Sequence, residues 1–171
     1  MHTSRRLLPT VVLLATLAVV LPACQRAQDA AAEAALERAT GTEMDIKDGG
    51  KQVTIKTDQG DLRIAAADAG DSVALPADFP ADVYLPRQHR VASVMDMAGL
   101  KMVNLTSTST LQALSAEVEK SMQAGGWKRE MAMQAEGSAS LMYSKDKRQA
   151  VYQLLKGDDG TQVAIRTGLG D

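Results

Sequence analysis

Cys24 is the only cysteine among the 171 residues, so it carries the one thiol with which this chain could do chemistry. It ends the tetrapeptide Leu21-Pro22-Ala23-Cys24, and residues 7–21 before it form a 15-residue run without a charge. Two arginines precede that run. A basic start, a short apolar stretch and a small residue at a cleavage position are typical of an export signal. Because a transmembrane helix needs about 20 apolar residues, we expect residues 1–23 to be a signal peptide.

The same tetrapeptide resembles the lipobox of bacterial lipoproteins, with Leu21, Ala23 and Cys24 at the matching positions. The resemblance implies cleavage before Cys24, and a diacylglycerol and an amide-linked fatty acid such as palmitate on that residue. Gln25, the next residue, implies sorting to the periplasmic face of the outer membrane. Two or more acyl chains give stable membrane attachment. The alternative is an ordinary secretory signal in which Cys24 is incidental.

Lipidation of Cys24 would exclude several kinds of chemistry. No free thiol would remain for a disulfide, a nucleophile or a zinc–thiolate site. His2 would leave with the signal peptide, so His89 would be the only imidazole, and no Gly-x-Ser-x-Gly motif accompanies it. The net charge of −2 gives no basic footprint for nucleic acid. We therefore expect a protein that is not an enzyme and has no cofactor. A small enzyme with a site near His89 is the less favoured alternative.

Methionine is the one abundant residue type with unusual chemistry. Seven of the nine methionines lie between residues 95 and 142, and two Met-x-Met pairs stand out, Met95 with Met97 and Met131 with Met133. Residues i and i+2 of a strand point to the same side, and soft thioether sulfur suits Cu(I). Methionine also fills cores that are poor in aromatic residues. We expect these four side chains to be core residues, with Cu(I) binding as the alternative.

Alanine, glutamate and arginine dominate residues 24–43, and these are good helix formers. Leu36 is the only large apolar side chain there, so we expect a partly helical tether between the lipid and the folded part. Residues 44–74 alternate apolar and polar side chains around turns at residues 48–50 and 58–60, which predicts a small β-meander followed by a linker. Such a ribbon must cover another surface in its own chain or in a partner.

The core domain is expected over residues 75–171 and begins with a Pro-rich entry strap, residues 75–86. The near-repeat Pro-Ala-Asp places Asp78 and Asp82 in this strap. Both aspartates could be calcium ligands, but a hard-cation site usually needs six or more oxygens. We therefore expect turn and capping roles for them.

Alternating strands and one amphipathic helix are predicted for the rest of the core. Ser109 and Gln112 fit a capping box, and apolar residues then recur at spacings of three and four up to a Gly-Gly pair at 125–126. The expected fold class is α+β: an antiparallel sheet of order ββαββββ with one helix on a face, preceded by the β-meander and the tether helix. The predicted core strands are 91–97, 100–105, 127–133, 139–144, 149–155 and 161–167.

The strap and the end of the helix resemble a small, poorly characterised α+β domain of bacterial envelope lipoproteins. The residues that carry this resemblance are Leu75-Pro76, Phe79-Pro80-Ala81-Asp82-Val83-Tyr84 and Gly126-Trp127. The resemblance implies a fold and a compartment but no activity. We expect a lipid-anchored binding or structural component of the cell envelope, whose partner is another envelope protein or a second copy of the chain.

Overall fold

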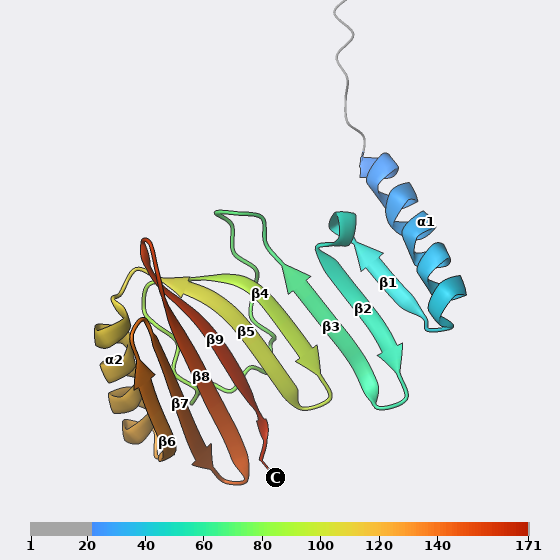
Figure 1. The fold of residues 1–171 in the computed structure, drawn as a ribbon. Helices are drawn as coiled ribbons and strands as arrows, with labels where there is room; N and C mark the ends of the chain where they lie inside the picture. The colour runs from blue at the N-terminus through green and yellow to red at the C-terminus, as the bar shows by residue number, and fades with distance from the viewer. Residues whose placement is uncertain (1–21, 171) are drawn as a thin grey trace, which may run out of the picture.

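The structure is a computed structural model that describes residues 22–170, without the side chains of residues 22–24. It is broadly α+β and rich in strand (Figure 1). The helices are α1 (Pro22–Thr40) and α2 (Leu111–Ala124), with a short 3-10 turn η1 (Asp48–Gly50). The strands are β1 (Met44–Lys47), β2 (Gln52–Thr57), β3 (Gly60–Ala66), β4 (His89–Met97), β5 (Leu100–Ser107), β6 (Lys128–Ala135), β7 (Ser138–Lys145), β8 (Arg148–Gly157) and β9 (Gly160–Leu169).

All nine strands of the described part belong to one antiparallel sheet with the order β1-β2-β3-β4-β5-β9-β8-β7-β6. The predicted arrangement, a core sheet of order ββαββββ preceded by a separate meander, is therefore wrong in its finer detail. Strand β3 pairs with β4 from Leu62↔Met97 to Ala66↔Ser93. The meander, here called the wing (β1–β3), thus extends the core sheet edge to edge because β4 offers it a free row of backbone hydrogen bonds.

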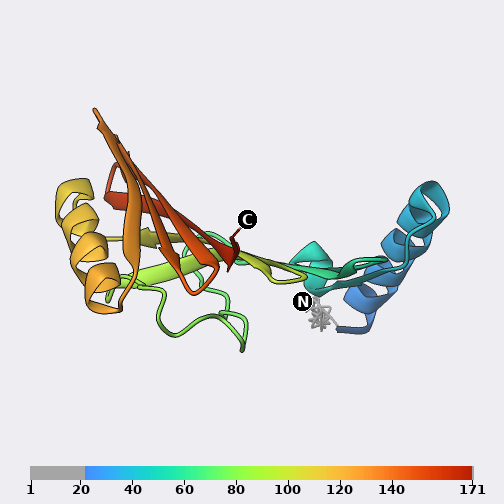
Figure 2. The same cartoon turned by 90° about the horizontal axis from the view of Figure 1, so that it is seen from below.

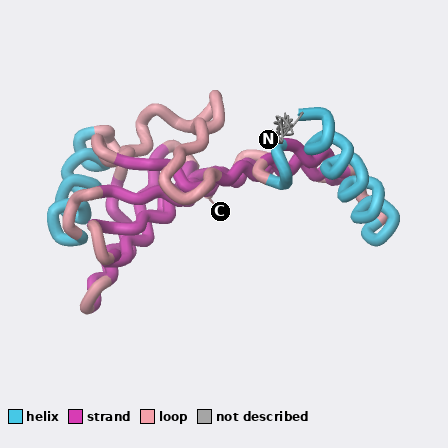
Figure 3. Tube along the Cα trace, turned by 90° about the horizontal axis from the view of Figure 1, so that it is seen from above, coloured by secondary structure: helices cyan, strands magenta, loops and turns pink. Residues whose placement is uncertain are grey.

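Helix α2 and the strap cover the same face of the core part of the sheet (Figures 2 and 3). The side chains of Leu114, Val118 and Met122 form the inward stripe of α2 and are fully buried against the sheet. The helix begins after Thr110, whose hydroxyl accepts a hydrogen bond from the amide of Ala113. The capping box expected from Ser109 and Gln112 is therefore wrong by one residue, because Thr110 takes the extended N-cap conformation.

Helix α1 lies along the free edge of β1 (Figure 1). Three acidic side chains spaced four residues apart share one face of the helix and accept hydrogen bonds from backbone amides of β1 and η1. The pairs are Glu37 with Met44, Glu33 with Ile46, and Asp29 with Gly49. The helix expected to be a tether thus docks through carboxylates, which satisfy amides of an edge strand that could otherwise pair with another chain.

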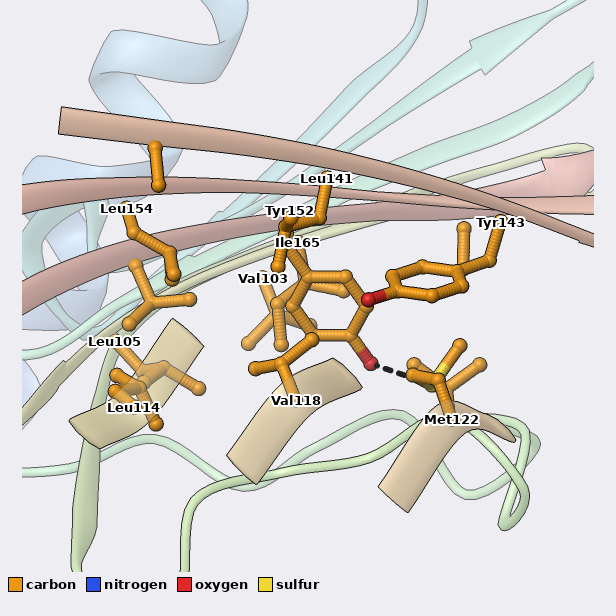
Figure 4. Close-up of a cluster of buried hydrophobic side chains, with 14 of the residues drawn as sticks. Val103, Leu105, Leu114, Val118, Met122, Leu141, Tyr143, Tyr152, Leu154 and Ile165 are labelled. Carbon is orange, nitrogen blue, oxygen red and sulfur yellow. Dashed lines mark hydrogen bonds between the residues drawn. The ribbon is translucent and has the colours of Figure 1, made fainter. Parts of the chain in front are cut away.

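Two tyrosines at the centre of the core differ in how their hydroxyls are satisfied (Figure 4). The Tyr152 hydroxyl donates to the carbonyl of Tyr84 at 2.9 Å and lies 3.2 Å from the sulfur of Met122. The Tyr143 ring packs edge-on against Tyr152 at 6.1 Å, but its buried hydroxyl has no hydrogen-bond partner. Burial raises the pKa of both phenols, that of Tyr143 to about 12.

Replacing each tyrosine by phenylalanine should separate the two cases. Tyr152→Phe removes a made hydrogen bond and should cost about 1–2 kcal/mol of unfolding free energy. Tyr143→Phe removes a hydroxyl that is desolvated without compensation, so it should be neutral or stabilising. Urea unfolding of both variants checks this, and a larger loss for Tyr143→Phe would contradict the described hydrogen bonding.

Candidate functional site

The face of the sheet opposite α2 and the strap is the first candidate site. One row of directly paired side chains crosses all nine strands of the described part on this face. The row consists of Ile46, Val53, Ile64, Met95, Met102, Arg166, Val151, Met142 and Met131. A second row on the same face consists of Met44, Ile55, Leu62, Met97 and Leu100. We call the side of the sheet that carries these two rows the uncovered face. Only one side chain of the two rows is charged, and Ile46, at the β1 end beside α1, is the one member that is buried.

The wing presents its apolar side chains to the uncovered face and its polar ones to the side on which the strap lies. On β2, Val53 and Ile55 belong to the uncovered face, whereas Gln52 and Thr54 point to the other side. On strands β8 and β9 the large apolar side chains point to the covered side instead, where Tyr152 and Ile165 are buried under α2. The wing's apolar side therefore faces away from α2, whose backbone lies close to strands β6–β9 and not to the strands of the wing.

The four methionines of the Met-x-Met pairs lie on the uncovered face, so the expectation that they are core residues is wrong. Met97 is 37 % and Met133 61 % exposed, and Met95 and Met131 are half-buried. Strand alternation explains this placement, because the neighbours of Met95 on β4, Val94 and Asp96, point to the covered side. Of the methionines in the described part, only Met122 is in the core cluster.

His89 opens β4 and lines a surface hollow of about 670 Å³ between the β8–β9 turn and the segment after β5. Its Nδ1 lies 2.5 Å from the carbonyl oxygen of Pro86, which places the ring proton on Nδ1 and leaves Nε2 free. Asp158 and Asp159 line the same hollow. No hydroxyl of the described residues hydrogen-bonds to His89, so the hollow shows no pair of nucleophile and base. His89 is exposed.

The two aspartates of the strap lie in β-turns, as expected: Asp78 in the turn Pro76–Phe79 and Asp82 in the turn Pro80–Val83. Both also bind side-chain cations, which the sequence did not predict. Asp82 accepts two hydrogen bonds from Arg148, at 2.9 and 2.8 Å, and one from Lys145 at 2.9 Å. The guanidinium of Arg148 also lies 5.0 Å from the ring of Trp127, whose indole N–H donates to the Asp82 carbonyl. These four residues form the Asp82 cluster. The hydrogen bonds from Arg148, and then Lys145, hold the pKa of the Asp82 carboxyl well below its usual range.

Asp78 makes a similar but more exposed contact at the other end of the strap. Its carboxylate lies 2.8 Å from the ammonium of Lys101, which also donates to Asp96 at 2.8 Å. Burial opposes the charge of Lys101, yet the hydrogen bonds with Asp78 and Asp96 raise its pKa. Both aspartates therefore fix the strap to the sheet, and neither belongs to a cluster of His, Cys, Asp or Glu fit for a metal within the described residues.

The residues of the expected lipidation site lie largely outside the described part. Leu21 and most of the expected signal peptide are not described, and nothing is described of the Ala23 and Cys24 side chains. Gln25 is exposed in the first turns of α1. Neither helix of the described part is long and apolar enough to cross a membrane.

Comparison of the chain with protein-family models, with curated proteins and with solved structures finds no match.

The Asp82 cluster gives a testable dependence of stability on pH. Because the pKa of Asp82 is depressed in the fold, its stabilisation is complete above the unfolded pKa of about 3.9 and is lost as the pH falls below that value. Asp82→Asn should lower the unfolding free energy at pH 7 by on the order of 2 kcal/mol and flatten the acid limb of the stability profile. Urea unfolding between pH 7 and pH 3 measures both effects.

Asp78→Asn is the matched control, because the Asp78 side chain is 73 % exposed whereas that of Asp82 is 30 % exposed. It should cost clearly less than Asp82→Asn at pH 7. An equal cost for both variants would show that the Asp82 cluster has no special role.

Proposed function

We propose that this chain is a lipid-anchored protein of the periplasmic face of the outer membrane, which binds another envelope protein and is not an enzyme. The observation that carries the binding role is the uncovered face, on which a row of apolar side chains, interrupted by Arg166 alone, crosses the sheet from β1 to β6. On this face Met97 is 37 % and Met133 61 % exposed, and most of the other apolar side chains are half-buried with no element of the described part packed over them. Apolar side chains that lie side by side at the surface usually mark an interaction site. The lipobox-like segment ending at Cys24 supports the anchor and the compartment.

The two edges of the sheet are poor places for a partner to bind, which favours the face. The β1 edge is occupied by α1, whose Glu33 and Glu37 accept its amides. The β6 edge begins with the charged residues 128–130 and has a bulge between Arg129 and Met131. Charged side chains and bulges are devices that prevent strand addition. A partner would therefore pack against the face and would not extend the sheet.

The position of the anchor suggests which part of the sheet lies nearest the membrane. Cys24 is in the first turns of α1, and Asp29 of the same helix contacts Gly49 at the end of the wing. Five residues of helix span only about 7.5 Å. A lipid on Cys24 would thus hold the wing close to the bilayer, with the core sheet reaching away from it (Figure 1).

The absence of a paired catalytic constellation at His89 supports the non-enzymatic part of the proposal. The His89 hollow has a volume of about 670 Å³. Catalysis by His89 would need a nucleophile or substrate group held within hydrogen-bond reach, whereas its one hydrogen bond in the structure goes to the Pro86 carbonyl.

The anchor is tested by Cys24→Ser and Gln25→Asp in the native host. Cys24→Ser should abolish labelling by radioactive palmitate and should release the protein from the membrane fraction, because the acceptor thiol is lost. Gln25→Asp should remain labelled but move from the outer to the inner membrane. Palmitate labelling of Cys24→Ser equal to that of the unchanged protein would refute the anchor.

The binding face is tested by two lysine substitutions at neighbouring positions of β2. Ile55→Lys places a charge on the uncovered face, whereas Thr54→Lys places the same charge on the opposite face. Chemical cross-linking of intact cells should yield an adduct of the unchanged protein that Ile55→Lys reduces and Thr54→Lys retains. An adduct of twice the chain mass would identify self-association in place of a different partner. Equal cross-linking of both variants would contradict the proposal.

A further inference from the structure

Six of the methionines form two groups of three with the same arrangement on the uncovered face. In each group a Met-x-Met pair lies on one strand, and a third methionine lies on the neighbouring strand directly opposite the first. The β4–β5 triad is Met95 and Met97 with Met102, and the β6–β7 triad is Met131 and Met133 with Met142. Strands β9 and β8 separate the two triads in the sheet.

The three side chains of each triad are close enough for their sulfurs to converge. Directly opposite residues of an antiparallel pair have Cβ atoms about 4.5–5.5 Å apart, and diagonal neighbours are about 7–8 Å apart. Methionine is unbranched and turns about three side-chain bonds, so three thioethers can meet over such a triangle. Met97 and Met133 are the most exposed members, at 37 % and 61 %, and they leave the triads open to solvent.

Apolar packing alone does not account for the choice of methionine at these positions. The wing part of the same face is built mainly from branched side chains such as Val53, Ile55 and Ile64. Methionine replaces them on β4–β5 and again on β6–β7, each time in the same three-cornered arrangement. The covered core uses a single methionine among the described residues, Met122. The repetition points to a requirement for three sulfurs together.

We propose that each triad is a binding site for a monovalent soft metal ion, Cu(I), held by three thioether sulfurs. Thioethers are soft, neutral ligands that select Cu(I) over the hard cations. The described residues offer no cluster of three His, Cys, Asp or Glu side chains that would favour another metal. The proposal involves binding only, with no redox step, and it depends neither on the lipid anchor nor on a protein partner.

The charges near the triads predict that their affinities differ. Arg166 lies directly opposite Met102 of the β4–β5 triad. Near the β6–β7 triad, Glu130 precedes Met131 and accepts a hydrogen bond from Ser144, two residues beyond Met142, and its charge is balanced by the ammonium of Lys128 at 3.1 Å. A cation is disfavoured beside the guanidinium of Arg166, whereas the ion pair of Glu130 with Lys128 leaves no net positive charge beside the β6–β7 triad. The β6–β7 triad should therefore bind Cu(I) more tightly than the β4–β5 triad.

Competition with a chromogenic Cu(I) chelator, under anaerobic reducing conditions, tests the sites in the full chain purified from its native host, whichever cell fraction holds it. The protein should withdraw two equivalents of Cu(I) from the chelator. With ¹³C-methyl-labelled methionine, NMR should show shifts for the six triad methyls and none for Met44 or Met122. Failure to withdraw any Cu(I), or shifts confined to other methionines, would overturn the proposal.

Leucine variants then assign each equivalent to its triad. Met131→Leu with Met133→Leu should remove the tighter equivalent, and Met95→Leu with Met97→Leu the weaker one, while the control Met44→Leu on the same face should change neither. Leucine keeps the apolar volume, so the sheet and any protein docking should persist. Undiminished Cu(I) binding by the fourfold variant would overturn the proposal. Ile55→Lys should leave both equivalents in place, which separates this test from that of the protein partner.

Discussion

The pairing of β3 with β4 is the constraint on which the arrangement of the molecule depends. It joins the wing to the core sheet in one register, with Ile64 opposite Met95. Side chains alternate along a strand, so this register places the apolar side of the wing on the face opposite α2. A slip of one residue would turn the same side chains toward the strap and would expose the polar ones. The uncovered face is thus a consequence of one strand pairing and not of any single side chain.

On the covered face of the core sheet, the strap and α2 bury the apolar side chains. The strap crosses this face and is fixed at both ends by aspartates, Asp78 on Lys101 and Asp82 on Arg148 and Lys145. Phe79, between these two aspartates, and Leu75, Tyr84 and Leu85, on either side of them, pack against the core cluster, and α2 completes the layer over β6–β9. The start of the strap reaches the polar side of the wing, where residues 74–78 line a hollow with Gln52, Thr54 and Arg63, whereas α2 contacts no strand of the wing. On this side of the sheet, α2 and the strap therefore cover the strands whose side chains are apolar, and the polar side chains of the wing stay largely exposed.

Local patterns predicted the hairpins and α2 from the sequence, because strand alternation and a three–four apolar spacing are set by neighbouring residues. Alternation alone could not predict on which face of the sheet the methionines lie. A period of two shows that Met95 and Met97 point to the same face, but it does not show whether that face is the covered or the uncovered one. The tight turn Ala98-Gly99 pairs Met95 with Met102. This pairing could be predicted from the sequence, because a short turn sets the register of its hairpin. The β3–β4 pairing, the ion pairs of the strap and the docking of α1 through Glu33 and Glu37 join residues far apart in the chain, and no local pattern specifies such contacts. The lipid anchor at Cys24 stays a prediction.

Oxidation of methionine by dilute hydrogen peroxide, followed by mass spectrometry of peptides, tests most directly whether the face is open. The rate of sulfoxide formation follows the exposure of each sulfur. The account predicts that Met133 and Met97 are oxidised first, that the half-buried methionines of the same face follow, and that Met122, which is fully buried, is protected until the protein unfolds. If Met97 and Met133 in the isolated folded protein were as protected as Met122, the face would be covered and the account would be contradicted.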